Sequence, residues 1–287
     1  GLRLRVSGQN IYMVFEDDAA NIGTAEDVFV ISSKDGGTTF SAPVRVNHTI
    51  AGLNDSDDPE LETTGSSAFV AWIDNRSGND RVYFSRSVDG GATWSTDKRL
   101  DRAGFASDAG SPSLSVEGSN IHVVWVDDRR DLTVADQIFY VSSSDSGATF
   151  TLDKKLGSAV LGKDADDPRV SVSGSNVYVA WVDDRNGLGN DVFFASSTDG
   201  GTTFAADFAL DPDGGSIHDI SPHLRVKGDS VFVTYLEETL TPTLHQTWLS
   251  YSPVQGSSGS FQRLQLSATL GPSFDAHTQD VTITDAR

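Results

Sequence analysis

Apolar and polar residues alternate along short segments of this chain, with the two-residue period of β-strands. Residues 4–7 (Leu-Arg-Val-Ser) and 114–117 (Leu-Ser-Val-Glu) alternate strictly, and a glycine closes each run. No stretch has a convincing helical period. The pattern predicts an all-β chain of short strands joined by tight turns.

The strand pattern recurs about every 54 residues. Four segments share the sequence Ser-x-Asp-x-Gly-x-Thr-aromatic, and their aspartates are 54, 56 and 54 residues apart (89 − 35, 145 − 89 and 199 − 145). A fifth copy at 252–261 keeps the serine and the aromatic residue but lacks the aspartate. Each repeat is predicted to form four strands, designated A to D in chain order, with a glycine turn between A and B and the Ser-x-Asp turn between C and D. The aspartates of these turns are Asp35, Asp89, Asp145 and Asp199.

A single four-stranded sheet cannot bury both of its faces, so repeated sheets are expected to pack around an axis as the blades of a β-propeller. We predict one propeller domain over residues 1–287 with five antiparallel blades, six being the alternative. The repeats cover about 1–54, 55–107, 108–163, 164–218 and 219–274, and a further strand is expected within 275–287. That strand would pair where the ring closes or exchange between molecules, which predicts a monomer or a strand-exchanged oligomer. One aromatic residue per repeat is expected to fill the space between blades: Phe15, Trp72, Trp125, Trp181 and Tyr235.

The four Ser-x-Asp turns resemble the Asp-box, or BNR repeat, of sialidase-like propellers. The resemblance implies that their aspartates stabilise the C–D turns at the outer rim by accepting backbone hydrogen bonds. It also implies that a ligand site lies at the opposite end of the blades, where the D–A and B–C loops open. The sialidase catalytic motifs are not recognised, because the N-terminal Arg-Ile-Pro is missing and Tyr235 lies only two residues from Glu237 on one predicted strand.

Acidic residues are frequent in the D–A loops. Carboxylates are suitable ligands for a hard cation such as Ca²⁺, but the same aspartates are also suited to capping turns, and the spacing is not that of an EF-hand. Both interpretations stay open, with Ca²⁺ as the cofactor that such loops would hold. One aspartate per crossing stands shortly before the A strand: Asp55, Asp108, Asp164, Asp219 and Asp275.

Three B–C loops carry an arginine at an equivalent place, Arg76, Arg129 and Arg185. Each guanidinium is expected either to pair with an aspartate of its own loop or the next blade, or to converge with the others on an acidic ligand. The fifth repeat departs most from the others, at Asp219 and Glu237, and enzyme sites typically break a repeat. These five residues are the candidate ligand-binding residues.

The net charge and the composition argue against several classes of function. Lys and Arg number 21 and Asp and Glu 41, so the net charge is −20, which argues against binding to nucleic acid. The chain has no cysteine for a thiolate metal site and no apolar run that could insert into a membrane. The composition favours an extracellular or cell-surface location. We expect non-catalytic binding of a glycan or protein through the acidic loops, the alternative being an exo-glycosidase that uses two carboxylates.

Overall fold

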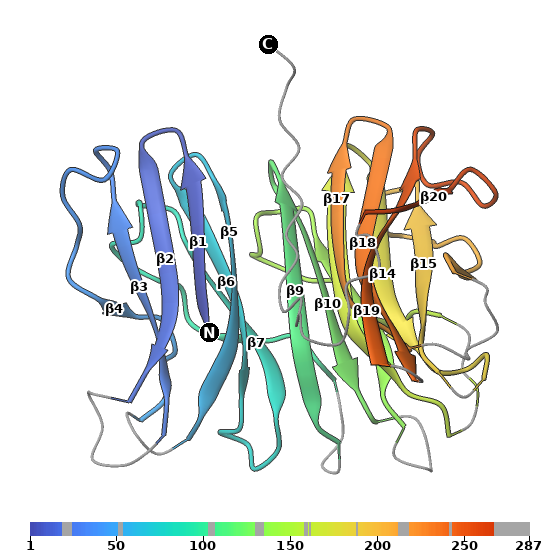
Figure 1. The fold of residues 1–287 in the computed structure, drawn as a ribbon. Helices are drawn as coiled ribbons and strands as arrows, with labels where there is room; N and C mark the ends of the chain where they lie inside the picture. The colour runs from blue at the N-terminus through green and yellow to red at the C-terminus, as the bar shows by residue number, and fades with distance from the viewer. Residues whose placement is uncertain are drawn as a thin grey trace. The chain divides into compact units, whose positions relative to one another are not determined.

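The computed structural model describes residues 1–18, 25–50, 54–102, 107–129, 135–157, 160, 162–187, 189–211, 218–240 and 243–266. These residues form five four-stranded sheets, and within each sheet the strands lie side by side in chain order (Figure 1). The described part of the chain contains no helix, and hence none that could cross a membrane. The prediction of an all-β fold with five antiparallel four-stranded sheets is confirmed. The predicted strand within 275–287, together with Asp275, lies outside the described residues.

The strand bounds follow the repeat. Sheet one contains β1 (Leu2–Ser7), β2 (Asn10–Asp17), β3 (Asp27–Ser33) and β4 (Val44–Arg45). Sheet two contains β5 (Ser56–Thr64), β6 (Ser67–Asp74), β7 (Arg81–Ser87) and β8 (Lys98–Arg99). Sheet three contains β9 (Ala109–Glu117), β10 (Asn120–Asp127), β11 (Gln137–Ser143) and β12 (Lys154–Lys155). Sheet four contains β13 (Ala165–Ser173), β14 (Asn176–Asp183), β15 (Asp191–Ser197) and β16 (Phe208–Ala209), and sheet five β17 (His218–Lys227), β18 (Ser230–Leu240), β19 (Thr243–Ser252) and β20 (Gln262–Gln265).

The chain divides into two compact units. Unit 1 consists of Gly1–Arg129 and Phe139–Lys154, and unit 2 of Arg130–Ile138 and Lys155–Arg287. The assignment of residues 1–287 to one domain stays a prediction.

Buried residues of the second and third strands form much of the core in each unit. Trp72, Trp125, Trp181 and Tyr235 are each 0% exposed. Trp72 stacks on Tyr83 with 6.1 Å between the ring centroids, and it packs against core residues of sheet one. The equivalent Phe15 is only half-buried and stacks on Phe29 with 6.0 Å between the ring centroids.

Hydrogen bonds from the Ser-x-Asp turn hold the C–D connection in each of the first four sheets. In sheet two, Asp89 accepts hydrogen bonds from the backbone N–H of Thr93 (3.0 Å) and from the Thr93 hydroxyl (2.6 Å). These bonds lower the pKa of Asp89 to about 2, because they favour the ionised carboxylate. Gly91 adopts a φ of +83°, which favours glycine. The fifth turn keeps the serine contacts, in which Ser252 Oγ accepts hydrogen bonds from the N–H groups of Val254 (3.3 Å) and Gly256 (3.2 Å).

Candidate functional site

The D–A and B–C loops open at one end of each sheet, where strand A begins, strand B ends and strand C begins. We call this the loop end. Three of the predicted cation ligands lie here and are exposed, namely Asp55, Asp108 and Asp164. Asp108 Oδ1 accepts hydrogen bonds from the Asp80 N–H (3.1 Å) and from Asn79 Nδ2 (2.8 Å). Each of the three aspartates therefore fastens the start of a C strand, since Asp55 and Asp164 accept the N–H of Glu26 and Asp136 in the same way.

Asp219 occupies a different position from these three aspartates. Its backbone N–H donates to the Asn190 carbonyl at 2.8 Å, just as the Ser56 N–H donates to the Glu26 carbonyl at 2.9 Å. Asp219 is therefore equivalent to Ser56, and not to Asp55 as we had expected from the sequence. The sequence indicates this shift of one position, because Asp219 stands three residues before a proline whereas Asp55 stands four residues before one.

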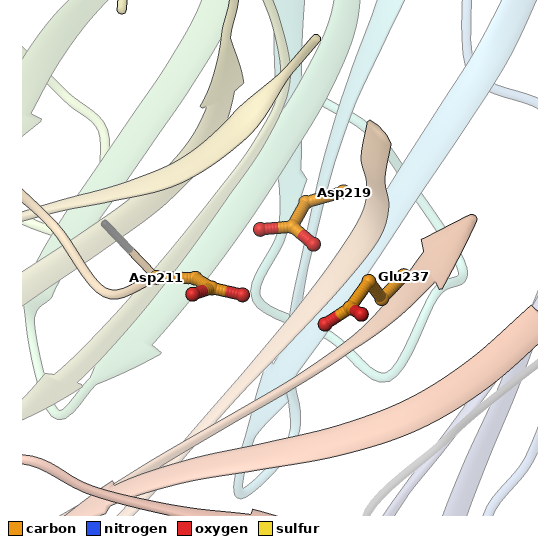
Figure 2. A group of neighbouring side chains, drawn as sticks. All are labelled: Asp211, Asp219 and Glu237. Carbon is orange, nitrogen blue, oxygen red and sulfur yellow. The ribbon is translucent and has the colours of Figure 1, made fainter. Parts of the chain in front are cut away.

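Asp219 instead belongs to a buried group of three carboxylates in unit 2. Asp211, Asp219 and Glu237 are 2%, 1% and 6% exposed, and one oxygen atom from each lies within 4.8 Å of the others. Figure 2 shows the three carboxylates pointing toward one another. Asp219 and Glu237 are partners across β17 and β18, and Asp211 follows β16. The group comes from one stretch of sheet four and two strands of sheet five.

The other sheets place smaller or neutral residues at two of these three positions. Ser56, Ala109 and Ala165 are equivalent to Asp219 by their backbone hydrogen bonds, and Asp74, Asp127 and Asp183 are equivalent to Glu237 by strand pairing. Asp211 directly follows Leu210, whose N–H donates a hydrogen bond to the Val192 carbonyl. By the same backbone hydrogen bond, the residues equivalent to Asp211 in the first three sheets are Asn47, Asp101 and Gly157. Among the described residues, the group of three acids arises only between sheets four and five.

One guanidinium reaches this group. Arg263 on β20 forms ion pairs with Asp211 and Glu237, and its Nε donates to the Tyr235 hydroxyl at 2.8 Å. Its guanidinium carbon lies 3.8 Å from the centre of the Trp248 ring. Three ionised carboxylates and one guanidinium leave two negative charges in excess in a buried place, which is unfavourable without a cation or protons. Oxygen ligands are those that Ca²⁺ prefers, so these three acids are the described residues that could hold a divalent cation.

Arg76, Arg129 and Arg185 each lie between two aspartates of their own sheet. Arg76 Nε donates to Asp74 at 2.8 Å, and its Nη1 donates to Asp97 at 2.6 Å. The guanidinium carbon lies 4.1 Å from the centre of the Tyr83 ring. Arg129 contacts Asp127 and Asp153 in the same manner, and Arg185 contacts Asp183 and Asp207. The side chains of the three arginines are 20%, 8% and 9% exposed.

Arg263 is the counterpart of these arginines on a different strand. Arg263 pairs with Ser250 on β19. In sheet four the position equivalent to Arg263 is that of Asp207, which directly precedes Phe208 on β16. Sheet five thus carries the arginine where sheets two to four carry the aspartate, and its B–C loop has no arginine. The place of this arginine on the fourth strand of sheet five was not predicted from the sequence. The absence of an arginine after Glu237 was the one indication of it in the sequence.

A second group of acids lies at the loop end of unit 1, around Asp57. The pKa of Asp57 is raised to about 7, mainly by burial and then by the neighbouring carboxylates of Asp58, Asp80, Glu16 and Asp55. Asp58 has a φ of +48°, and the β5–β6 register shifts between Asp57 and Glu60. This bulge interrupts the β5–β6 pairing next to the loop end. The residue before the proline has a positive φ in four sheets, at Asp58, Ser111, Asp167 and Ser221.

The fold of the chain is similar to that of several solved structures. No protein-family model and no curated protein sequence matches the chain. A protein of unknown function from Dyadobacter fermentans is 16% identical with a TM-score of 0.57, over 91% of this chain and 93% of that one. An ulvan lyase of polysaccharide lyase family 25 is 10% identical with a TM-score of 0.60, over 94% and 69% of the two chains.

A leech intramolecular trans-sialidase gives a TM-score of 0.57 at 11% identity, over 94% of this chain and 61% of the sialidase chain. At such identities a likeness shows the fold alone. Together with the five antiparallel sheets, it confirms the predicted propeller. The chain is therefore a five-bladed β-propeller.

Proposed function

We propose that this propeller binds carbohydrate through its loop end and does not turn it over. The observation that carries the proposal is the group of carboxylates around Asp57, at the end of the sheets where the loops leave side chains accessible. Carboxylates accept hydrogen bonds from sugar hydroxyls, and such charge-assisted bonds are stronger than neutral ones. The similarity in fold to a sialidase and a polysaccharide lyase supports a carbohydrate ligand.

The near-equivalence of the blades supports binding without catalysis. Three arginines at equivalent positions make equivalent contacts with aspartates, as in a repeated structural element. A catalytic site needs residues with different roles, and hence differences between blades. The buried acids of sheet five do form such a difference, but at 1–6% exposure they are placed to hold a small cation rather than a sugar.

An exo-glycosidase is the second candidate, and Asp57 is the observation that favours it. A carboxyl group with a pKa of about 7 beside other carboxylates has the pairing of acid and base that glycoside hydrolysis uses. In this case Asp57 would donate a proton to the leaving oxygen, and a neighbouring carboxylate such as Asp80 would act as base or nucleophile.

We also propose that the four Ser-x-Asp turns are Asp-boxes, which the hydrogen bonds of Asp35, Asp89, Asp145 and Asp199 support. An extracellular or cell-surface setting, a bound Ca²⁺ and a monomer or strand-exchanged oligomer remain part of the proposal.

The test is a glycan array probed with the purified chain, in parallel with a panel of aryl-glycosides that includes a sialic acid. We expect binding on the array, no release of the aryl group, and weaker binding by Asp57→Asn. The matched control is Asp229→Asn, which makes the same change at the opposite end of sheet five. Turnover that Asp57→Asn abolishes would establish the glycosidase instead, and absence of both binding and turnover would contradict a carbohydrate function.

A further inference from the structure

Aspartates of the same unit engage several of the described cationic side chains near the loop end of unit 1. Arg76 and Arg129 each contact two carboxylates, which leaves their guanidinium groups few directions from which a ligand could approach. His48 pairs with Asp97 at 2.6 Å. Four further arginines near the loop end of unit 1 contact carboxylates, namely Arg45 with Asp27, Arg81 and Arg99 with Asp101, and Arg102 with Asp153.

Five carboxylates at the same end form no ion pair within the part of the chain that the structure describes. Asp55, Asp58 and Asp108 are exposed, and Asp57 and Asp80 are half-buried. Burial raises the pKa of Asp80, the carboxylates of Asp108 and Asp55 raise it further, and Arg81 offsets part of this shift. A second negative charge brought to this end would meet the same repulsion, whereas a cationic group would relieve it.

We infer that the loop end of unit 1 takes saccharides that are cationic or uncharged, in that order of affinity, and rejects anionic ones. The inference rests on the proposed carbohydrate function and adds the charge class of the ligand. Amino sugars satisfy it, because an ammonium group can bind the exposed carboxylates while the ring hydroxyls donate hydrogen bonds to them. The Arg–Asp pairs are the specificity-determining feature, since they withhold the guanidinium groups that an acidic sugar would need.

Three β-1,4-linked tetrasaccharides of the same length test the inference, made of glucosamine, N-acetylglucosamine and glucuronic acid. Isothermal titration at pH 6, in low and in moderate salt, compares their affinities for the whole chain. We expect the glucosamine tetramer to bind about tenfold more tightly than the N-acetyl form in low salt, and to lose most of this advantage as salt screens the charges. The glucuronic acid tetramer is expected not to bind.

Asp153→Asn frees one side of Arg129 and is expected to weaken binding of the glucosamine tetramer and give measurable binding of the glucuronic acid tetramer. Its control is Glu117→Gln, which removes the same charge from the opposite end of sheet three and should change neither. If Asp153→Asn does not fold, the exposed Asp55→Asn tests the charge alone and should reduce glucosamine binding without a change in melting temperature.

Binding of the glucuronic acid tetramer by the wild-type chain as tight as that of the N-acetyl tetramer would overturn the inference and leave the carbohydrate function standing. If none of the three saccharides, nor any on the glycan array, binds, the proposed function fails and the inference fails with it.

Discussion

Replacing Asp219 by serine tests the charge excess between sheets four and five. Serine is the residue that sheet two carries at this position, where Ser56 donates a hydrogen bond to Asp74 at 2.8 Å. Asp219→Ser removes one of three carboxylates whose oxygens lie within 4.8 Å of one another. At that separation and an effective dielectric constant of about 20, each like-charge pair is worth about 3.5 kcal/mol.

The substitution relieves two such repulsions and gives up one attraction of similar size, to Arg263. It also removes the acceptor of the Val192 N–H, a long bond of 3.4 Å, whose loss costs about 1 kcal/mol. The balance is a gain of about 2.5 kcal/mol in the free energy of unfolding when no cation is bound.

Urea unfolding in the presence of EDTA measures this gain, and the same titration with added Ca²⁺ shows whether the three acids hold the ion. We expect Asp219→Ser to be more stable than wild type in EDTA, and Ca²⁺ to stabilise wild type but not the variant. Ser56→Asp is the reciprocal control and should destabilise, because it adds a carboxylate beside Asp74. A variant that is less stable than wild type in EDTA would refute the charge argument.

Three further predictions concern stability. Trp125→Ala should lower the free energy of unfolding by about 3–5 kcal/mol, because the indole is 0% exposed, and thermal or urea unfolding like that of wild type would contradict its place in the core. Asp89→Ala should cost about 1–2 kcal/mol through the lost turn hydrogen bonds and leave saccharide affinity unchanged by titration calorimetry. Asp57 binds its proton more tightly when folded, since its pKa rises from 3.8 to about 7, so its contribution to stability is full below about pH 4 and is lost as pH rises to 7. After allowance for solvent screening this loss is about 1–2 kcal/mol, and Asp57→Asn should flatten the profile of unfolding free energy between pH 4 and 7, whereas an unchanged slope would contradict the burial of Asp57.

The repeat made the sheets and their turns predictable from sequence. Period-two alternation locates strands such as β13, and the Ser-x-Asp turns give the register of one sheet relative to the next. Trp72 and Trp181 were expected in the core for the same reason, and both are fully buried.

The buried acids were predictable only in part. Asp219 and Glu237 stand out because they break the repeat, but Asp211 lies in the D–A connection, where the sequence carries many acids and one more is no signal. The role of Arg263 depends on an exchange of partners between strands, since its guanidinium approaches Glu237 from β20 and not from the B–C loop. Comparing equivalent positions between repeats could not reveal Arg263, because this arginine lies on a different strand from its counterparts in sheets two to four.

Hydrogen–deuterium exchange with and without the tightest-binding oligosaccharide shows whether a saccharide binds at the loop end. We expect slower exchange in peptides that cover 54–60 and 75–80, with no change in the C–D turns at 33–40 and 87–94. Protection confined to the C–D turns, or no protection at saturating saccharide, would contradict binding at the loop end.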